Sequence, residues 1–229
     1  MRGYMEQNRL RTEYLIKGLS RLGCTSINPG IRDFSLGVEY LLKLQKETNV
    51  DFVSANVYYY ESGKRVFEPF VISTVESNNA ALNPIKIGIL GLCQPKNVLV
   101  PEHSSDIQVQ SKSLYESIKD PLAKLSKKAD IVILLYHGTF SNLKVLMDKN
   151  PEIDVVVLGG QYYAANQYQW EMPALVSSPP LGKYLSKLEL VLDGNQDIIT
   201  YHKERLPLDE DVPDDPEMQE LIRDYNEEQ

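Results

Sequence analysis

Apolar residues recur with two different periods over the first two thirds of the chain, which predicts helices alternating with strands. Spacings of three and four residues predict amphipathic helices over 7–22, 35–47, 111–128 and 142–149. Short runs rich in apolar and β-branched residues predict strands over 24–28, 52–60, 66–74, 85–92, 130–138 and 153–160. This order of segments is typical of an α/β domain.

The last third of the chain follows a different pattern. Apolar residues predict further strands over 173–178, 183–193 and 197–206, and a hairpin at Asp193-Gly194-Asn195 joins the last two. From residue 207 the sequence is acidic and contains several prolines, which is typical of a linker, and a short amphipathic helix over 216–225 follows. The whole order favours a mixed α/β fold of the αββα class, with two mixed β-sheets packed together and helices outside.

Composition limits the classes of partner. The chain has 229 residues, a formal net charge of −8 and 42% hydrophobic residues, so it can bury a full core. The negative charge and the lack of a basic stripe argue against nucleic acid as a partner. No apolar run approaches the roughly 20 residues of a membrane-spanning helix. The two cysteines, Cys24 and Cys93, form no CxxC motif, so neither a zinc ribbon nor a covalent haem site is encoded here.

Three strand-to-loop junctions carry the candidate chemistry. In α/β sheets ligands gather at the carboxyl ends of strands, so we expect these junctions to meet in one crevice. The candidate residues are Arg32, Asp33, His137, Gln161, Tyr162 and Tyr163. Asp33 is expected to stay ionised because the adjacent Arg32 cation would lower its pKa. An ordinary ion pair beside a structural histidine is the alternative interpretation.

Five phrases of the chain, taken in order, resemble the 5′-nucleotidase branch of the calcineurin-like metallophosphoesterases. They are GIRDFSLGVEYLLKL, FVSANVYYYESGKRVFEPFVI, IKIGILGL, ADIVILLYHG and PEIDVVVLGG, and the resemblance runs from about residue 10 to residue 205. It implies a metallophosphoesterase-like sandwich. It also implies an ancestral activity, the hydrolysis of phosphoric esters at a pair of divalent metals.

The Gly-Asn-His-Glu-Phe-Asp motif of that family, which supplies a metal ligand, is altered in this chain. Where the family reads Gly-Asn-His-Glu-Phe-Asp, this chain has GIRDF over 30–34. Ile31 therefore stands in place of the asparagine ligand, and Arg32 in place of the histidine that stabilises charge on the phosphoryl group. The still earlier Asp-x-His and Gly-Asp motifs have no counterpart, so the domain predicted over 1–206 is expected to lack the first strands of the fold. The segment 207–229 is predicted to be an acidic linker and a C-terminal helix.

The later metal-binding motifs are reduced as well. His137 keeps the histidine of the third motif, but Gln161 and Tyr163 replace both histidines of the last one. The resemblance therefore leaves His137 as the one retained ligand position. We expect no catalytic residues and no metal cofactor, in contrast to the two divalent metals of the ancestral family.

Three functional hypotheses follow. The first is a non-catalytic binding or assembly module, in which the tyrosines at 162 and 163 dock a partner over the altered site or simply fill it. The second is a phosphoesterase (nucleotide hydrolase) completed by a missing N-terminal segment or a partner chain. The third is a small-ligand module in which Arg32 holds an anion such as phosphate.

The resemblance also suggests a setting for the protein. The expected partner is another protein chain or domain, and a multihaem cytochrome is one candidate, because the tail VPDDPEMQELIRDYN resembles the connector of cytochrome-linked relatives. Neither nucleic acid nor membrane insertion is expected. The resemblance implies an extracytoplasmic or periplasmic location, with the cytoplasm as the alternative.

Overall fold

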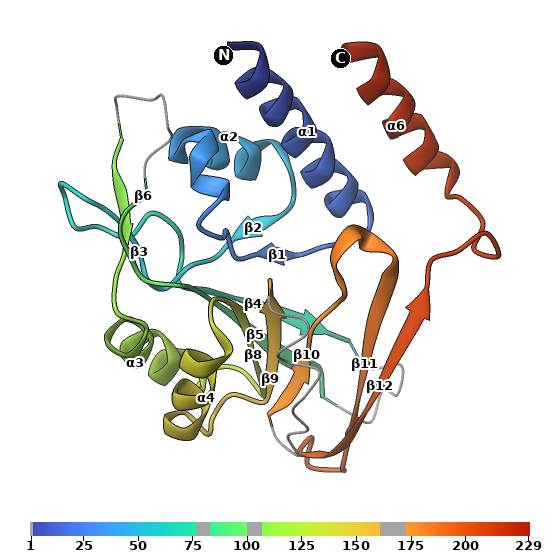
Figure 1. Cartoon of the computed structure of the whole chain (residues 1–229). Helices are drawn as coiled ribbons and strands as arrows, with labels where there is room; N and C mark the ends of the chain where they lie inside the picture. Colours follow the sequence, from blue (N-terminus) through green and yellow to red (C-terminus); the bar gives the residue numbers. More distant parts are fainter. Residues whose placement is uncertain (1, 77–82, 100–106, 161–172) are drawn as a thin grey trace.

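A five-stranded mixed sheet forms the centre of the computed structural model, which describes residues 2–76, 83–99, 107–160 and 173–229 (Figure 1). The strand order is β10-β9-β8-β5-β4. The bounds are β4 (Phe70–Val75), β5 (Ile85–Cys93), β8 (Ile131–His137), β9 (Val155–Gly159) and β10 (Ala174–Val176). All neighbours run parallel except β4, which pairs antiparallel with β5 at one edge.

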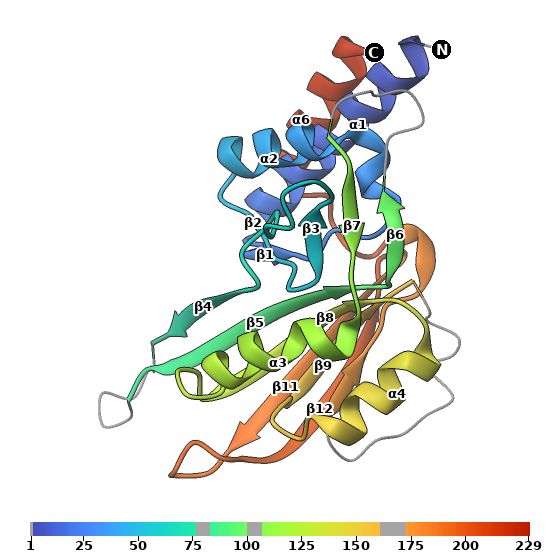
Figure 2. The same cartoon turned by 90° about the vertical axis from the view of Figure 1, so that its left-hand side faces the viewer.

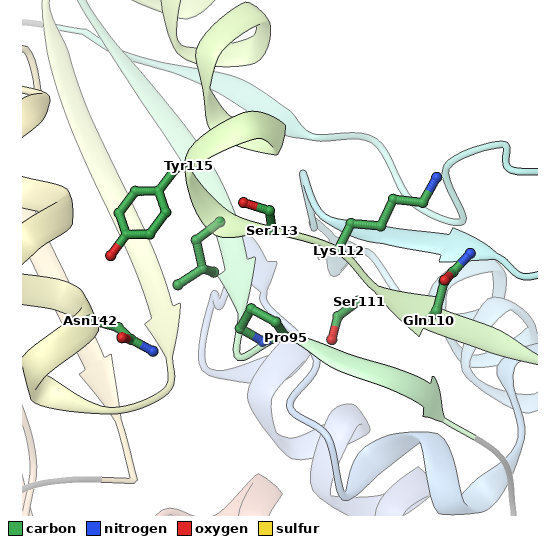
Figure 3. A pocket seen from close by; sticks show the side chains of 8 residues that line it. Pro95, Gln110, Ser111, Lys112, Ser113, Tyr115 and Asn142 are labelled. Atoms are coloured by element: carbon green, nitrogen blue, oxygen red, sulfur yellow. The ribbon is translucent and has the colours of Figure 1, made fainter.

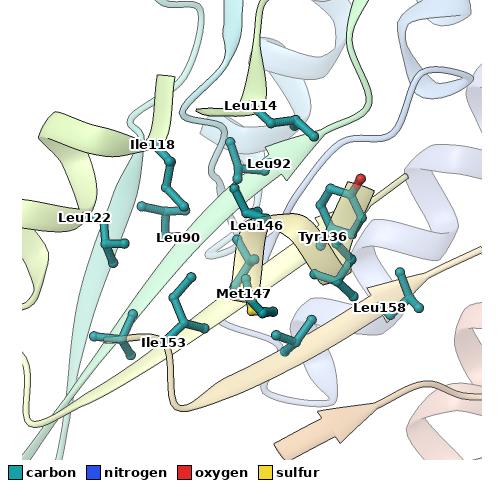
Figure 4. Close-up of a cluster of buried hydrophobic side chains, with 14 of the residues drawn as sticks. Leu90, Leu92, Leu114, Ile118, Leu122, Tyr136, Leu146, Met147, Ile153 and Leu158 are labelled. Carbon is teal, nitrogen blue, oxygen red and sulfur yellow. The ribbon is translucent and has the colours of Figure 1, made fainter. Parts of the chain in front are cut away.

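Two helices cover one face of this sheet and enclose the larger core (Figures 2 and 4). They are α3 (Leu114–Leu125) and α4 (Phe140–Lys149), each begun by a side chain, Ser113 or Thr139, that accepts a backbone N–H bond. The buried side chains that meet between helices and sheet include Leu90, Leu92, Leu114, Ile118, Leu122, Leu134, Tyr136, Leu146 and Leu158. Burial of such side chains, at roughly 1.5–3 kcal/mol each, supplies the main stabilisation of this layer.

A second core lies at the carboxyl end of the central sheet. It is built from α2 (Val38–Glu47) and two small sheets, the parallel pair β1 (Ser26–Ile27) with β2 (Asp51–Phe52), and the antiparallel set β3 (Val57–Tyr59), β7 (Val109–Ser111) and β6 (Lys96–Leu99). Phe34, Phe52 and Phe67 form its aromatic centre, with ring centroids about 6 Å apart (6.2 and 6.0 Å). Figure 2 shows this upper part above the central sheet.

The end of the chain forms a long hairpin and a returning helix. Strands β11 (Tyr184–Leu192) and β12 (Ile198–Pro207) pair antiparallel, and Lys203 Nζ donates to the Leu175 carbonyl of β10 at 3.3 Å. Helix α6 (Pro216–Glu228) then lies beside α1 (Arg2–Arg21). Arg21 Nη1 donates to the Glu217 carbonyl at 2.8 Å, and Tyr14 Oη donates to Glu228 Oε1 at 2.8 Å.

The predicted fold class is confirmed, and so is the alternation of helices with strands. The helix predicted over 35–47 is divided, because Gly37 has φ +91° between a short 3₁₀ helix, η1 (Asp33–Leu36), and α2. The strand predicted over 52–60 is divided into β2 and β3. Strands β6 and β7 were not predicted, since three- and four-residue strands carry too few positions to show a period. Among the described residues no helix is both long and apolar enough to cross a bilayer.

The close approach of β5 to the upper part gives a test of the packing. A Cβ built at Gly91 would lie 2.2 Å from the Val53 carbonyl oxygen. The backbone on either side of this atom is fixed, because Val53 N–H donates to the Ile27 carbonyl and Ala55 N–H donates to the Gly91 carbonyl. We therefore expect Gly91→Ala to lower the free energy of unfolding by about 2–4 kcal/mol. Gly194→Ala, where the added Cβ meets nothing within 4 Å, is the matched control in urea unfolding. Equal stability of the two variants would contradict this packing.

Candidate functional site

The register of the parallel strands brings three loops to one edge of the central sheet. Cys93 of β5 pairs with His137 of β8, and His137 pairs with Gly159 of β9. Each of these residues is the last of its strand. The carboxyl ends of β5, β8 and β9 therefore lie side by side at one edge of the sheet, where ligands gather in α/β proteins.

The loop after β1 completes this site by placing Gly30 against the imidazole. A Cβ built at Gly30 would lie 3.1 Å from Cδ2, Cε1 and Nε2 of His137, so the ring covers the glycine. Gly30 N–H donates to Asp33 Oδ2 at 2.7 Å. Of the predicted site residues, Asp33 and His137 are thus brought to one place, and Arg32 lies exposed in the same short loop.

Asn28 is a polar residue of this site that sequence reasoning missed. Its Nδ2 donates to the carbonyls of Leu92 and Leu135 at 2.7 and 3.1 Å, which ties the loop after β1 to two strands of the central sheet. Its Oδ1 is buried and has no hydrogen-bond partner among the described residues, and the same holds for Nδ1 of His137. The available signal was its place at the carboxyl end of a predicted strand, directly before Pro-Gly.

The expected effect of Arg32 on Asp33 is wrong. The pKa of Asp33 is raised above its ordinary value of 3.8, because the surrounding protein excludes part of the water around its carboxylate. The residue as a whole is still exposed at the surface. The Gly30 N–H bond and the nearby His137 oppose this rise without cancelling it. Arg32 does not contribute to the pKa of Asp33, because its side chain is exposed and does not pair with the Asp33 carboxylate.

The buried side chain of Asn56 binds the backbone at the end of β5. Asn56 Oδ1 accepts from Cys93 N–H at 2.9 Å, and its Nδ2 donates to the carbonyls of Cys93 and Lys112 at 2.6 and 3.0 Å. Burial raises the pKa of the Cys93 thiol to about 12, and the Asp33 charge adds to the rise while a bond with Ser111 opposes it. Cys93 is therefore a protonated, unreactive thiol at neutral pH. Cys24 and Cys93 are both free, not joined in a disulfide.

A wider cavity adjoins this edge, between the first turns of α3 and α4 (Figure 3). Its volume is about 590 Å³, and its lining includes Pro95, Lys112, Ser113, Tyr115 and Asn142. No group of three or more His, Cys, Asp or Glu side chains suited to a metal ion occurs among the described residues, here or elsewhere.

The remaining predicted site residues lie outside the described residues. They are Gln161, Tyr162 and Tyr163, together with the neighbouring Tyr168 and Trp170. The predicted docking patch formed by these side chains therefore stays a prediction. The described site ends at Gly160, which has φ +84° and where a built Cβ would lie 3.6 Å from His137 Nε2.

The described donors do not fit a two-metal centre. Two divalent ions held close together need several carboxylates and imidazoles. The described side chains offer one carboxylate and one imidazole, Asp33 and His137, and the neutral Asn28 oxygen. Ile31, a half-buried apolar residue of the second core, occupies the position where the resemblance places a ligand.

The chain is similar to 5′-nucleotidases and calcineurin-like phosphoesterases, in agreement with the resemblance seen in its sequence. No family model matches the chain. Among curated proteins, a 5′-nucleotidase of Vibrio cholerae is 30% identical over 145 residues, which are 61% of this chain and 25% of that protein. A 5′-nucleotidase of Bos taurus is 24% identical over 223 residues, 86% of this chain and 37% of that protein.

Solved structures show the same fold at lower identity. The calcineurin-like phosphoesterase YfkN of Bacillus subtilis matches with a TM-score of 0.75 and 20% identity, over 97% of this chain and 76% of that one. A 5′-nucleotidase precursor of Thermus thermophilus also has a TM-score of 0.75, with 21% identity over 96% of this chain and 46% of that one. The chain thus spans 25% and 37% of the length of the two curated relatives above.

The environment of Asp33 can be measured directly by carboxyl NMR titration. We expect a midpoint above 3.8 in the wild type, little change in Arg32→Ala, and a further rise in His137→Gln, which removes a group that favours the carboxylate. A midpoint below 3.8, or a rise in Arg32→Ala, would contradict this assignment.

The same shift sets the sign of a small pH effect on stability. Because the folded pKa is raised, the contribution of Asp33 to stability is complete below about pH 3.8 and is lost as pH rises through the folded value. Asp33→Asn should therefore gain stability relative to wild type between acid and neutral pH. The gain should stay below ~1 kcal/mol, because the side chain keeps solvent contact.

Proposed function

We propose that this chain is a 5′-nucleotidase-like domain that no longer hydrolyses phosphoric esters and acts as a binding or assembly module. The observation that carries this proposal is the donor set at the carboxyl edge of the sheet. Its described side chains provide one carboxylate, that of Asp33, and one imidazole, that of His137. Two divalent cations need several such ligands.

The packing of the imidazole also supports the proposal. His137 lies flat on Gly30, so the site volume next to the glycine is occupied by the ring itself. The Cys93 thiol, the remaining nucleophile of this edge, stays protonated because burial raises its pKa to about 12. The thiol of Cys93 is therefore not available as a thiolate nucleophile at neutral pH.

The setting of the module is proposed from resemblance. We propose a protein partner and an extracytoplasmic location, with a multihaem cytochrome module as one candidate partner. Pull-down with candidate haem modules supplied by the same genome would test this pairing by the absorbance of bound haem.

The loss of hydrolysis is tested by metal content and turnover. The purified chain, supplied with Mn²⁺, Zn²⁺, Co²⁺ or Mg²⁺, should release no phosphate from AMP and no nitrophenol from bis-p-nitrophenyl phosphate. Its rate should equal that of His137→Ala, and elemental analysis after gel filtration should find well under about one divalent ion per chain.

The matched variant separates true turnover from contamination. Any trace of a co-purified hydrolase would be the same in wild type and His137→Ala, because the substitution changes this chain alone. Two bound ions per chain with turnover that disappears in His137→Ala would overturn the proposal. That result would favour the phosphoesterase hypothesis instead.

A further inference from the structure

The two terminal helices lie side by side at the end of the molecule farthest from the hairpin tip and α4 (Figures 1 and 2). They run antiparallel, since the Tyr14 ring of α1 packs at a tilt against the Tyr225 ring of α6, with centroids 5.4 Å apart, while Arg21 donates to the Glu217 carbonyl. Leu221 is buried between them and approaches Gly18. The pair is therefore held in a defined geometry.

The outer face of this helix pair is apolar. Leu15, Leu19 and Leu22 follow the spacing of one helix stripe, and they are 60%, 38% and 70% exposed. Ile222 of α6 is 58% exposed, and it lines an apolar cavity of about 170 Å³ together with Leu15. An exposed, contiguous apolar stripe of this kind marks an interaction site.

Charge on the two helices is opposite in sign. Helix α1 carries five basic and two acidic residues, a net +3, whereas α6 carries five acidic residues and one basic, a net −4. Among the described residues, the ion pairs of these helices each lie within one helix, Lys17 with Glu13 in α1 and Arg223 with Glu220 in α6. At positions spaced three and four residues from Ile222 along α6, Gln219 and Asn226 are uncharged.

We propose that this face, defined by Leu15, Leu19, Leu22 and Ile222, binds the same face of a second copy of the chain. A two-fold axis would place α1 of one copy on α6 of the other, so that a basic helix meets an acidic one twice and the apolar stripes meet at the centre. Contact of α1 with its own copy would bring like charges together. The opposite net charges of α1 and α6 therefore favour this arrangement, an antiparallel four-helix bundle.

The size of the face sets the expected affinity. At 1.5 Å per residue the helices are about 30 and 20 Å long, and a pair is roughly 20 Å wide. Each copy would then bury on the order of 500 Å², which is the lower limit of specific interfaces. A reversible dimer with a dissociation constant in the micromolar range is expected. This inference does not depend on the proposed loss of hydrolysis, because it concerns a different surface.

Sedimentation velocity of the full 229-residue chain between about 1 and 300 μM tests the dimer. Wild type should shift from the 26.0 kDa monomer to twice that mass. Leu15→Glu and Ile222→Glu should each raise the dissociation constant at least about tenfold, because a carboxylate would be buried in the interface. Both positions are exposed in the monomer, so the variants should keep the wild-type thermal melt.

Val145→Glu is the matched control, since Val145 is also an exposed apolar helix residue, 42% accessible, but lies on α4. It should dimerise as wild type does. A monomer throughout the concentration range would overturn the proposal, and so would a dimer that resists both interface substitutions. Equal weakening by Val145→Glu would place the contact elsewhere and would overturn it as well.

Discussion

Two asparagine side chains hold the upper part of the molecule onto the central sheet. The carboxyl ends of parallel strands leave backbone groups that the next strand cannot satisfy, and these groups are costly when buried. Asn28 satisfies two of these groups by donating to the carbonyls of Leu92 and Leu135. Asn56 satisfies both backbone groups of Cys93, donating to its carbonyl and accepting from its N–H. The position of the loop that carries Asp33 relative to His137 depends on these bonds.

The larger core and the candidate site are built from different residues. The large core beneath α3 and α4 is built from Leu90, Leu134 and Leu146, and none of these residues is a site residue. Ile31 contributes to the second core from a position where the resemblance places a metal ligand. The larger core is thus independent of the site, whereas the second core and the site share residues.

The charge of the chain is distributed unevenly, and this matters for association. A net charge of −8 makes two copies repel on average, yet α1 is basic and α6 is acidic. The helix pair is therefore a local exception in which attraction between copies is directional. Composition alone would have missed it, because the two helices are separated by almost the whole chain and their charges nearly cancel in the total.

The sequence by itself determined the long elements and the fold class, since the runs over 85–92, 130–138 and 153–160 have enough residues to show their burial. It also placed Asp33 and His137 in one candidate site by assuming that their strands share a sheet, whereas β1 lies in a separate sheet and Asn28 ties the loop after it to the central one. Tertiary structure alone decided the role of Asn28, the raised pKa of Asp33 and the pairing of α1 with α6. These three depend on contacts between distant segments and on local exclusion of water, and neither is encoded in the spacing of neighbouring residues.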